Sequence, residues 1–313
     1  MANRGFLQFT PAYLGVSLAA VWIPGAAFWM YFAAAVLLAI GLPIILKDEV
    51  PSARGLDKIL PFGRLFYAIP MAVFGVEHFC FPEEIGQMVP SWIPAHPFWV
   101  YLVGLALIAA ALSIVVKRQA WLAATLLGIM LCLFVLLISA PAVVANPRDR
   151  FAWAVSLRDL AFSGGAFAFA GTQTKARPAT GVPALVTLGR FFVGVPAVFF
   201  GVEHFLHPEF APGVPLPMIT PTWIPVRLFS AYLAGAVLAA AGLSIIANKK
   251  GRLAATYLGI VILLLVLFVY LPILAADPKS IAIGLNYFFD TLAFSGAILL
   301  LADALPKESD SHA

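Results

Sequence analysis

The stretch GRLFYAIPMAVFGVEHFCFPE, residues 63–83, returns as GRFFVGVPAVFFGVEHFLHPE at residues 189–209. The two copies are 126 residues apart at this point. After a five-residue insertion in the second copy the spacing becomes 131, so PSWIP (90–94) matches PTWIP (221–225). Further on, LAFSG (160–164) returns at 292–296. Self-similarity at a nearly fixed spacing indicates one structural unit that occurs twice.

The composition is that of a membrane protein. Of 313 residues, 62% are hydrophobic and 11% are charged, whereas soluble domains carry about 25% charged residues. A spanning helix needs about 20 apolar residues. Backbone polar groups in hydrocarbon must be satisfied within their own segment, so each run of that length is expected to be a helix. Nine such runs cover residues 28–46, 63–80, 97–116, 121–145, 152–171, 185–205, 229–247, 253–275 and 283–303.

The repeat predicts how these spans are arranged. Each copy holds four spans, so both copies enter the membrane from the same side and are related by an axis along the membrane normal. Residues 22–47 also resemble residues 92–117, which makes the first span a lone second helix of a third, partial copy. We therefore predict an all-α polytopic membrane protein with two parallel-repeat four-helix bundles and one extra N-terminal helix. The expected units are an N-terminal segment (1–62), a first bundle (63–171), a linker (172–188), a second bundle (189–303) and a tail (304–313).

Basic residues predict the orientation. One set of alternate loops, with the C-terminal tail, holds most of the 19 lysines and arginines. Because cytoplasmic loops carry an excess of Lys and Arg, the N-terminus is predicted outside and the C-terminus in the cytoplasm of a bacterial-type inner membrane. The outer set holds only Arg4, Arg148, Arg150, Arg158, Arg227 and Lys279.

The order of the repeated motifs resembles a known family. GVEHF is followed by Pro82 and Glu83, by VPSWIP, and by a basic turn that leads into LAAT, and a closely similar series occurs in the second copy. This order is similar to that of the DoxX-like integral membrane proteins. The resemblance covers residues 63–171 and 189–303, and it implies a four-helix membrane unit, here in tandem. It also implies membrane redox work, as in a quinone-reducing thiosulfate oxidoreductase subunit.

Ionisable residues within the spans are the candidate functional residues, because a charge at mid-span costs roughly 2.5–3.5 kcal/mol on insertion scales. We expect those in the outer half of the membrane to converge on one polar pocket. Asp290 matches either Arg158 or Asp159, since a one-residue slip between the copies leaves its partner ambiguous. The candidates are Glu77, His78, Glu203 and His204 at two equivalent span ends, and Arg158, Asp159, Asn286, Tyr287 and Asp290 in the fourth span of each copy.

Two interpretations of these residues stay open. In the functional one, His78 and His204 bind or protonate a quinone carbonyl, since imidazole titrates near physiological pH. In the structural one, Glu and His satisfy a helix end, Arg158 is neutralised by a carboxylate, and the loop tryptophans anchor at the membrane interface. The functional interpretation gives Glu77, Glu203, Asp159 and Asp290 a proton-relay role, and adds Arg158, Tyr287, Trp92 and Trp223 to the binding residues.

The predicted function is thus a membrane redox subunit or a quinone-interacting protein with a soluble redox partner. The alternative is binding or transport of a lipid or a small hydrophobic molecule. Haem bound by the two histidines is disfavoured because they lie close to the surface, and no metal site is expected. Cys80 and Cys132 form no CxxC pair. Dispersed basic residues argue against nucleic-acid binding, so membrane lipids are the expected contacts.

Overall fold

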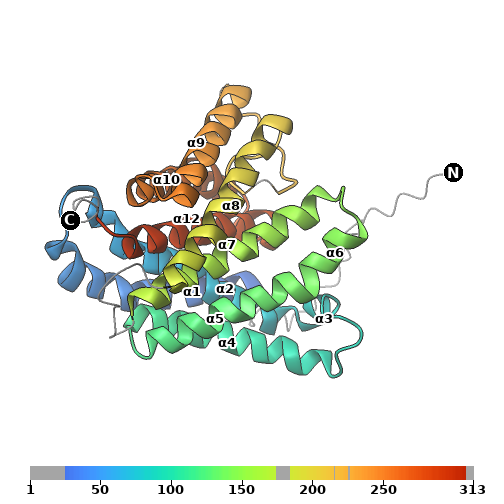
Figure 1. Ribbon diagram of the computed structural model, residues 1–313. Coiled ribbons are helices and arrows are strands. Elements are labelled where there is room, and N and C mark those ends of the chain that lie inside the picture. The colour runs from blue at the N-terminus through green and yellow to red at the C-terminus, as the bar shows by residue number, and fades with distance from the viewer. Residues whose placement is uncertain (1–24, 174–183, 215, 225, 308–313) are drawn as a thin grey trace.

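The computed structural model describes residues 25–173, 184–214, 216–224 and 226–307, and these ranges are almost entirely helical (Figure 1). Within them, the extended backbone amounts to one isolated bridge between Phe210 and Ile219. Eight helices in the described ranges are long and apolar enough to cross a membrane. The prediction of an all-α polytopic membrane protein is therefore confirmed.

The first copy and the segment before it supply eleven helical elements within the described ranges. The extra N-terminal span is α1 (Ala26–Ile44), which continues through η2 (Ile45–Glu49), η3 (Val50–Ser52) and η4 (Gly55–Phe62). The first copy then follows as α2 (Gly63–Cys80), α3 (Pro82–Gly86), α4 (His96–Val116), α5 (Ala120–Phe134) with η5 (Val135–Ser139) and α6 (Ala140–Ala145), and α7 (Arg150–Thr172).

The second copy repeats this series without a counterpart of α3 in the described residues. Its elements are α8 (Ala184–Leu206), α9 (Arg227–Ala247), α10 (Gly251–Leu265) with η6 (Val266–Tyr270) and α11 (Leu271–Ala276), and η7 (Ile281–Leu285) with α12 (Asn286–Ala304). The predicted span boundaries agree with these helices to within a few residues. The expected span at residues 152–171 is α7, whose 23 residues measure about 34 Å at 1.5 Å per residue. It is more polar than the other expected spans and is not among the eight apolar helices.

The third span of each copy contains a π-helical turn at the same place. The turns η5 and η6 each directly precede a short helix with proline in its first turn, Pro141 in α6 and Pro272 in α11. Proline has no N–H to donate to the helical ladder, and single π-helical turns occur inside α-helices as local departures from the regular ladder. The turns place Ser139 and Tyr270, which are equivalent residues, among buried side chains.

The fourth helices of the two copies form the centre of the molecule. Figure 1 shows α7 and α12 between α4 and α5 on one side and α9 and α10 on the other. The first helix of each copy packs on the second helix of its own copy and on the fourth helix of the other copy, so α2 contacts α4 and α12, and α8 contacts α9 and α7. The copies are therefore interlocked through their first and fourth helices.

Equivalent residues face one another across the contact between α7 and α12. Arg158 is bonded to Asp290, and about two helical turns further on Gly165 packs against Ala297. The two partners are 132 residues apart in both pairs. Contacts between equivalent residues at two levels require parallel helices related by a pseudo-twofold axis along their length. The axis also resolves the ambiguous alignment, because it makes Asp290 the counterpart of Arg158.

The N-terminal segment binds both copies at the end where the chain enters α2. Helix α1 packs on α2 and α4, and Glu49 in η2 bonds to Arg64 of α2 and to Lys117 after α4. Asp57 in η4 pairs with Arg252 at the start of α10 and with Lys307. We name these ion pairs of Glu49 and Asp57 the charged clasp. They connect the N-terminal segment to both copies at the predicted cytoplasmic face.

Replacement of Gly165 by Ala is expected to separate α7 from α12. A Cβ atom at Gly165 would lie 2.5 Å from the Cβ of Ala297 and 2.6 Å from its Cα, so the two backbones must shift. Overpacking of this kind costs about 1–3 kcal/mol, which we expect to lower the thermal midpoint in detergent micelles. The control is Gly86→Ala, where the nearest atom is 4.0 Å away. Equal midpoints for the two variants would contradict this packing.

Candidate functional site

Five polar residues from three helices form a cluster on the pseudo-twofold axis, which we name the central cluster. Its members are Glu77 of α2, Arg158 and Asp159 of α7, and Asn286 and Asp290 of α12. Arg158 donates from Nη1 to Asp290 at 2.9 Å, and from Nε and Nη2 to Asp159 at 3.0 and 2.9 Å. Asn286 donates from Nδ2 to Glu77 at 3.0 Å. One guanidinium therefore shares the cluster with three carboxyl groups.

The central cluster is enclosed but not sealed. The side chain of Arg158 is 21% exposed and that of Asp159 is 13% exposed, whereas that of Asp290 is 6% exposed. The Oδ1 atom of Asn286 is buried and has no hydrogen-bond partner among the described residues. Polar atoms of Arg158 and Asp159 thus remain within reach of a bound molecule.

A second polar group, which we name the second-copy group, lies at the equivalent end of α8 and comprises Arg150, Glu203, His204 and Tyr270. Arg150, at the start of α7, donates from Nε to Glu203 at 2.5 Å, and its guanidinium carbon lies 4.1 Å from the ring centroid of Phe210. Glu203 is 8% exposed. The carboxylate in the second copy is therefore paired with an arginine, where Glu77 in the first copy receives the amide of Asn286.

The two histidines occupy equivalent places and have different surroundings. In both, Nδ1 donates to the backbone oxygen four residues earlier, Phe74 for His78 and Phe200 for His204. The Nε2 atom of His204 also accepts the N–H of Gly213 at 3.0 Å, which makes that imidazole neutral and fully bonded. The Nε2 atom of His78 has no bond partner within the described residues, and His78 is partly exposed.

The lengthened loop of the second copy causes this difference. Its residues 211–214 and Leu216 are buried, and the hydroxyl of Tyr270 donates to the backbone oxygen of Pro212 at 2.8 Å. The first copy has Ser139 in place of Tyr270, and its shorter loop contains α3 and stays at the surface. The longer loop therefore fills the interior of the second copy, and His204 holds this loop by accepting the N–H of Gly213.

The structure brings together some of the predicted site residues and separates others. Glu77, Arg158, Asp159 and Asp290 meet in the central cluster, where Asp159 and Asp290 are the carboxylates that pair with Arg158. Glu203 and His204 lie in the second-copy group. Tyr287 and Met218 of the loop pack against the same buried cluster, which contains Ala211 and Tyr270. Trp92 and Trp223 are 71% and 54% exposed and touch neither group, as expected of interfacial anchors.

Two residues of the second-copy group, Arg150 and Tyr270, are not among the site residues predicted from the sequence. Arg150 was counted only as a loop charge, because it stands at the predicted start of a span. Tyr270 lies within the predicted span 253–275 and is not among the candidate residues, although the repeat aligns it with Ser139 and so marks a place where the copies differ. A comparison of unequal residues between the copies would have found it.

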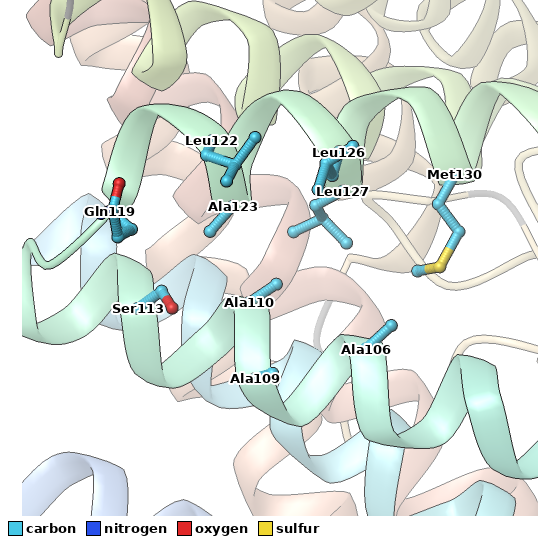
Figure 2. Close-up of a pocket in the computed structure, with 10 residues that line it drawn as sticks. All are labelled: Ala106, Ala109, Ala110, Ser113, Gln119, Leu122, Ala123, Leu126, Leu127 and Met130. Atoms are coloured by element: carbon cyan, nitrogen blue, oxygen red, sulfur yellow. The ribbon is translucent and has the colours of Figure 1, made fainter.

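An apolar cavity of about 320 Å³ lies apart from both polar groups, between α4 and α5 (Figure 2). It lies toward the turn that joins these helices. Small side chains of α4 and aliphatic side chains of α5 form most of its wall, so its chemistry suits a hydrocarbon chain. The lining residues are Ala106, Ala109, Ala110, Ser113, Gln119, Leu122, Ala123, Leu126, Leu127 and Met130.

Comparison with known proteins gives one partial match. A family described as a domain of unknown function (DUF8561) matches residues 67–157, which run from α2 into the first turns of α7. No curated protein and no solved structure matches the chain.

The two histidines are expected to respond differently to replacement by alanine. His204→Ala removes the acceptor of the Gly213 N–H, and an unpaired buried donor costs about 1–3 kcal/mol. We expect faster hydrogen exchange in residues 207–220 and a lower thermal midpoint. His78→Ala removes an imidazole with one free nitrogen and is expected to change the midpoint less. Similar exchange rates in both variants would contradict a structural role for His204.

The ion pair on the axis is expected to give strongly non-additive mutations. Arg158→Leu leaves Asp159 and Asp290 without their cation, which costs about 3–5 kcal/mol for a buried pair. Asp290→Leu should cost less, since Arg158 keeps Asp159. The double variant should be more stable than the sum of the single changes predicts, by about 0.5–3 kcal/mol. Unfolding in mixed micelles measures the cycle, and strict additivity would show that the pair is not coupled.

Proposed function

We propose that the protein binds the polar head of a quinone-class molecule at the first copy, as a component of membrane redox work. The observation that carries this proposal is that Nε2 of His78 has no hydrogen-bond partner among the described residues. At the equivalent place in the second copy, buried loop residues occupy the space and both ring nitrogens of His204 are bonded. Because Nδ1 of His78 donates to a carbonyl, Nε2 of the neutral ring is a hydrogen-bond acceptor. It therefore suits the hydroxyl group of a quinol.

The central cluster supplies the complementary groups. Arg158 is a permanent donor whose partly exposed side chain could bond to a carbonyl oxygen of the quinone form. The carboxylates beside it, Asp159 and Asp290, can pass on protons released by the ring. The electrons of a quinol would leave to a soluble redox partner. The similarity of the repeated motifs to the DoxX-like proteins supports this assignment.

The orientation belongs to the same proposal. With the N-terminus outside and the C-terminus in the cytoplasm of an inner membrane, His78 and the central cluster lie in the outer half of the bilayer. The charged clasp with Lys117, Arg252 and Lys307 then lies at the cytoplasmic face, where basic residues are favoured. A lipophilic ligand would enter the site from the outer leaflet.

A second candidate function is the binding of a lipid or another small hydrophobic molecule. The apolar cavity between α4 and α5 favours it, because that wall offers no charged group and only two polar ones. Ala110→Leu would fill this cavity from α4. A loss of lipid that co-purifies with the protein, measured by mass spectrometry, would favour this second function.

Titration with a short-chain ubiquinol tests the first proposal. We expect the solubilised protein to bind it and His78→Asn to weaken binding by about tenfold, the effect of one lost hydrogen bond of about 1.4 kcal/mol. Calorimetric titration measures the affinity. The matched control is His207→Asn, since His207 is a surface residue whose imidazole pairs with the exposed Glu209. Equal binding by all three proteins, or none by any, would refute the proposal.

A further inference from the structure

Helix α1 packs on an apolar face of α2 and α4, which we name the seat of α1, and an ion pair lies at one end of this face. Leu65 and Ile69 of α2 are 1% and 7% exposed beneath α1, and Val115 of α4 is fully buried. Gly41 of α1 allows this close approach, since a Cβ there would lie 2.8 Å from Cγ1 of Val115. Beyond the end of α1, Glu49 bonds to Arg64, which is 2% exposed.

The equivalent face of the second copy carries no such helix among the described residues. Phe191 and Val195 of α8, which correspond to Leu65 and Ile69, are 41% and 44% exposed. Leu188 on the same stripe is 37% exposed, and Ile246 of α9, the counterpart of Val115, is half-buried. The repeat therefore presents the same kind of seat twice, and α1 covers it once.

The arginine at the end of the uncovered face, Arg190, also lacks an equivalent of Glu49 among the described residues. Arg190 corresponds to Arg64, and its guanidinium carbon lies 5.1 Å from the ring centroid of Phe191. Within the described part of the chain it has no carboxylate partner, and its Nε is buried without a hydrogen bond. A positive charge thus stands beside the open apolar face where Glu49 closes the first seat.

We propose that the face formed by Leu188, Phe191 and Val195 of α8 with Ile246 of α9 binds a transmembrane helix of a partner protein. The occupant carries a carboxylate at its cytoplasmic end, which pairs with Arg190 as Glu49 pairs with Arg64. Its seat-facing side holds a small residue, as Gly41 does in α1, because backbones approach closely at such helix contacts. The proposal goes beyond quinone binding and does not depend on it.

Cross-linking with an α1-type peptide tests the seat. The protein carries Phe191→Cys with Cys80 and Cys132 replaced by Ala, and the probe is a synthetic peptide of residues 25–52 with Gly41→Cys. In phosphatidylcholine vesicles under mild oxidation we expect a disulfide between protein and peptide. Glu49→Lys in the peptide should lower the yield about tenfold through loss of the charged pair. Adding Arg190→Glu to the protein should restore it with the Glu49→Lys peptide.

A matched control uses the occupied seat. Leu65→Cys stands at the equivalent position beneath the chain's own α1, and we expect the peptide not to reach it. Four results would overturn the proposal: no cross-link at position 191, a yield that ignores both charge reversals, loss of the cross-link when phosphatidylglycerol is added, or a disulfide between two Phe191→Cys chains. The third would assign Arg190 to an anionic lipid and the fourth would assign the face to a second copy. Circular dichroism verifies that every variant is folded.

Discussion

The charge of Arg158 has to be neutralised within a hydrocarbon layer, and the arrangement of the central helices follows from this constraint. Arg158 reaches Asp159 on its own helix and Asp290 on α12, so α7 and α12 must lie side by side at this level. Glycine and alanine at positions 165 and 297 permit the contact further along. With α7 and α12 fixed, α8 and α2 pack on them reciprocally, and the outer helices follow.

The two copies use this frame in different ways. Both keep the bond from the fourth-helix serine to a glycine carbonyl, Ser163 to Gly128 and Ser295 to Gly259, each 2.8 Å long. The second copy has filled its interior with loop residues that bind His204, while His78 in the first copy keeps a free nitrogen. The lengthened loop thus gives two equivalent histidines different surroundings, because only His204 has both ring nitrogens bonded within the described residues.

Most of the fold could be predicted from the sequence, whereas the site could be predicted only in part. Apolar runs and the repeat gave the helices and their parallel relation, because span length and periodic motifs are local properties. The pairing of Arg158 with Asp159 is also local, since the two are adjacent in the chain. The bond from Arg158 to Asp290 and the burial of residues 211–214 depend on how distant segments dock. No local pattern carries that information.

The ion pair between Arg158 and Asp290 also constrains the ancestry of the chain. A symmetric dimer of two identical four-helix chains places each axial residue opposite itself. Arginine would then have faced arginine, or aspartate faced aspartate, and like charges at this distance repel strongly in a medium of low dielectric constant. Complementary charges on the axis require two halves that differ in sequence. Joining the halves in one chain gave mutation the freedom to place opposite charges there.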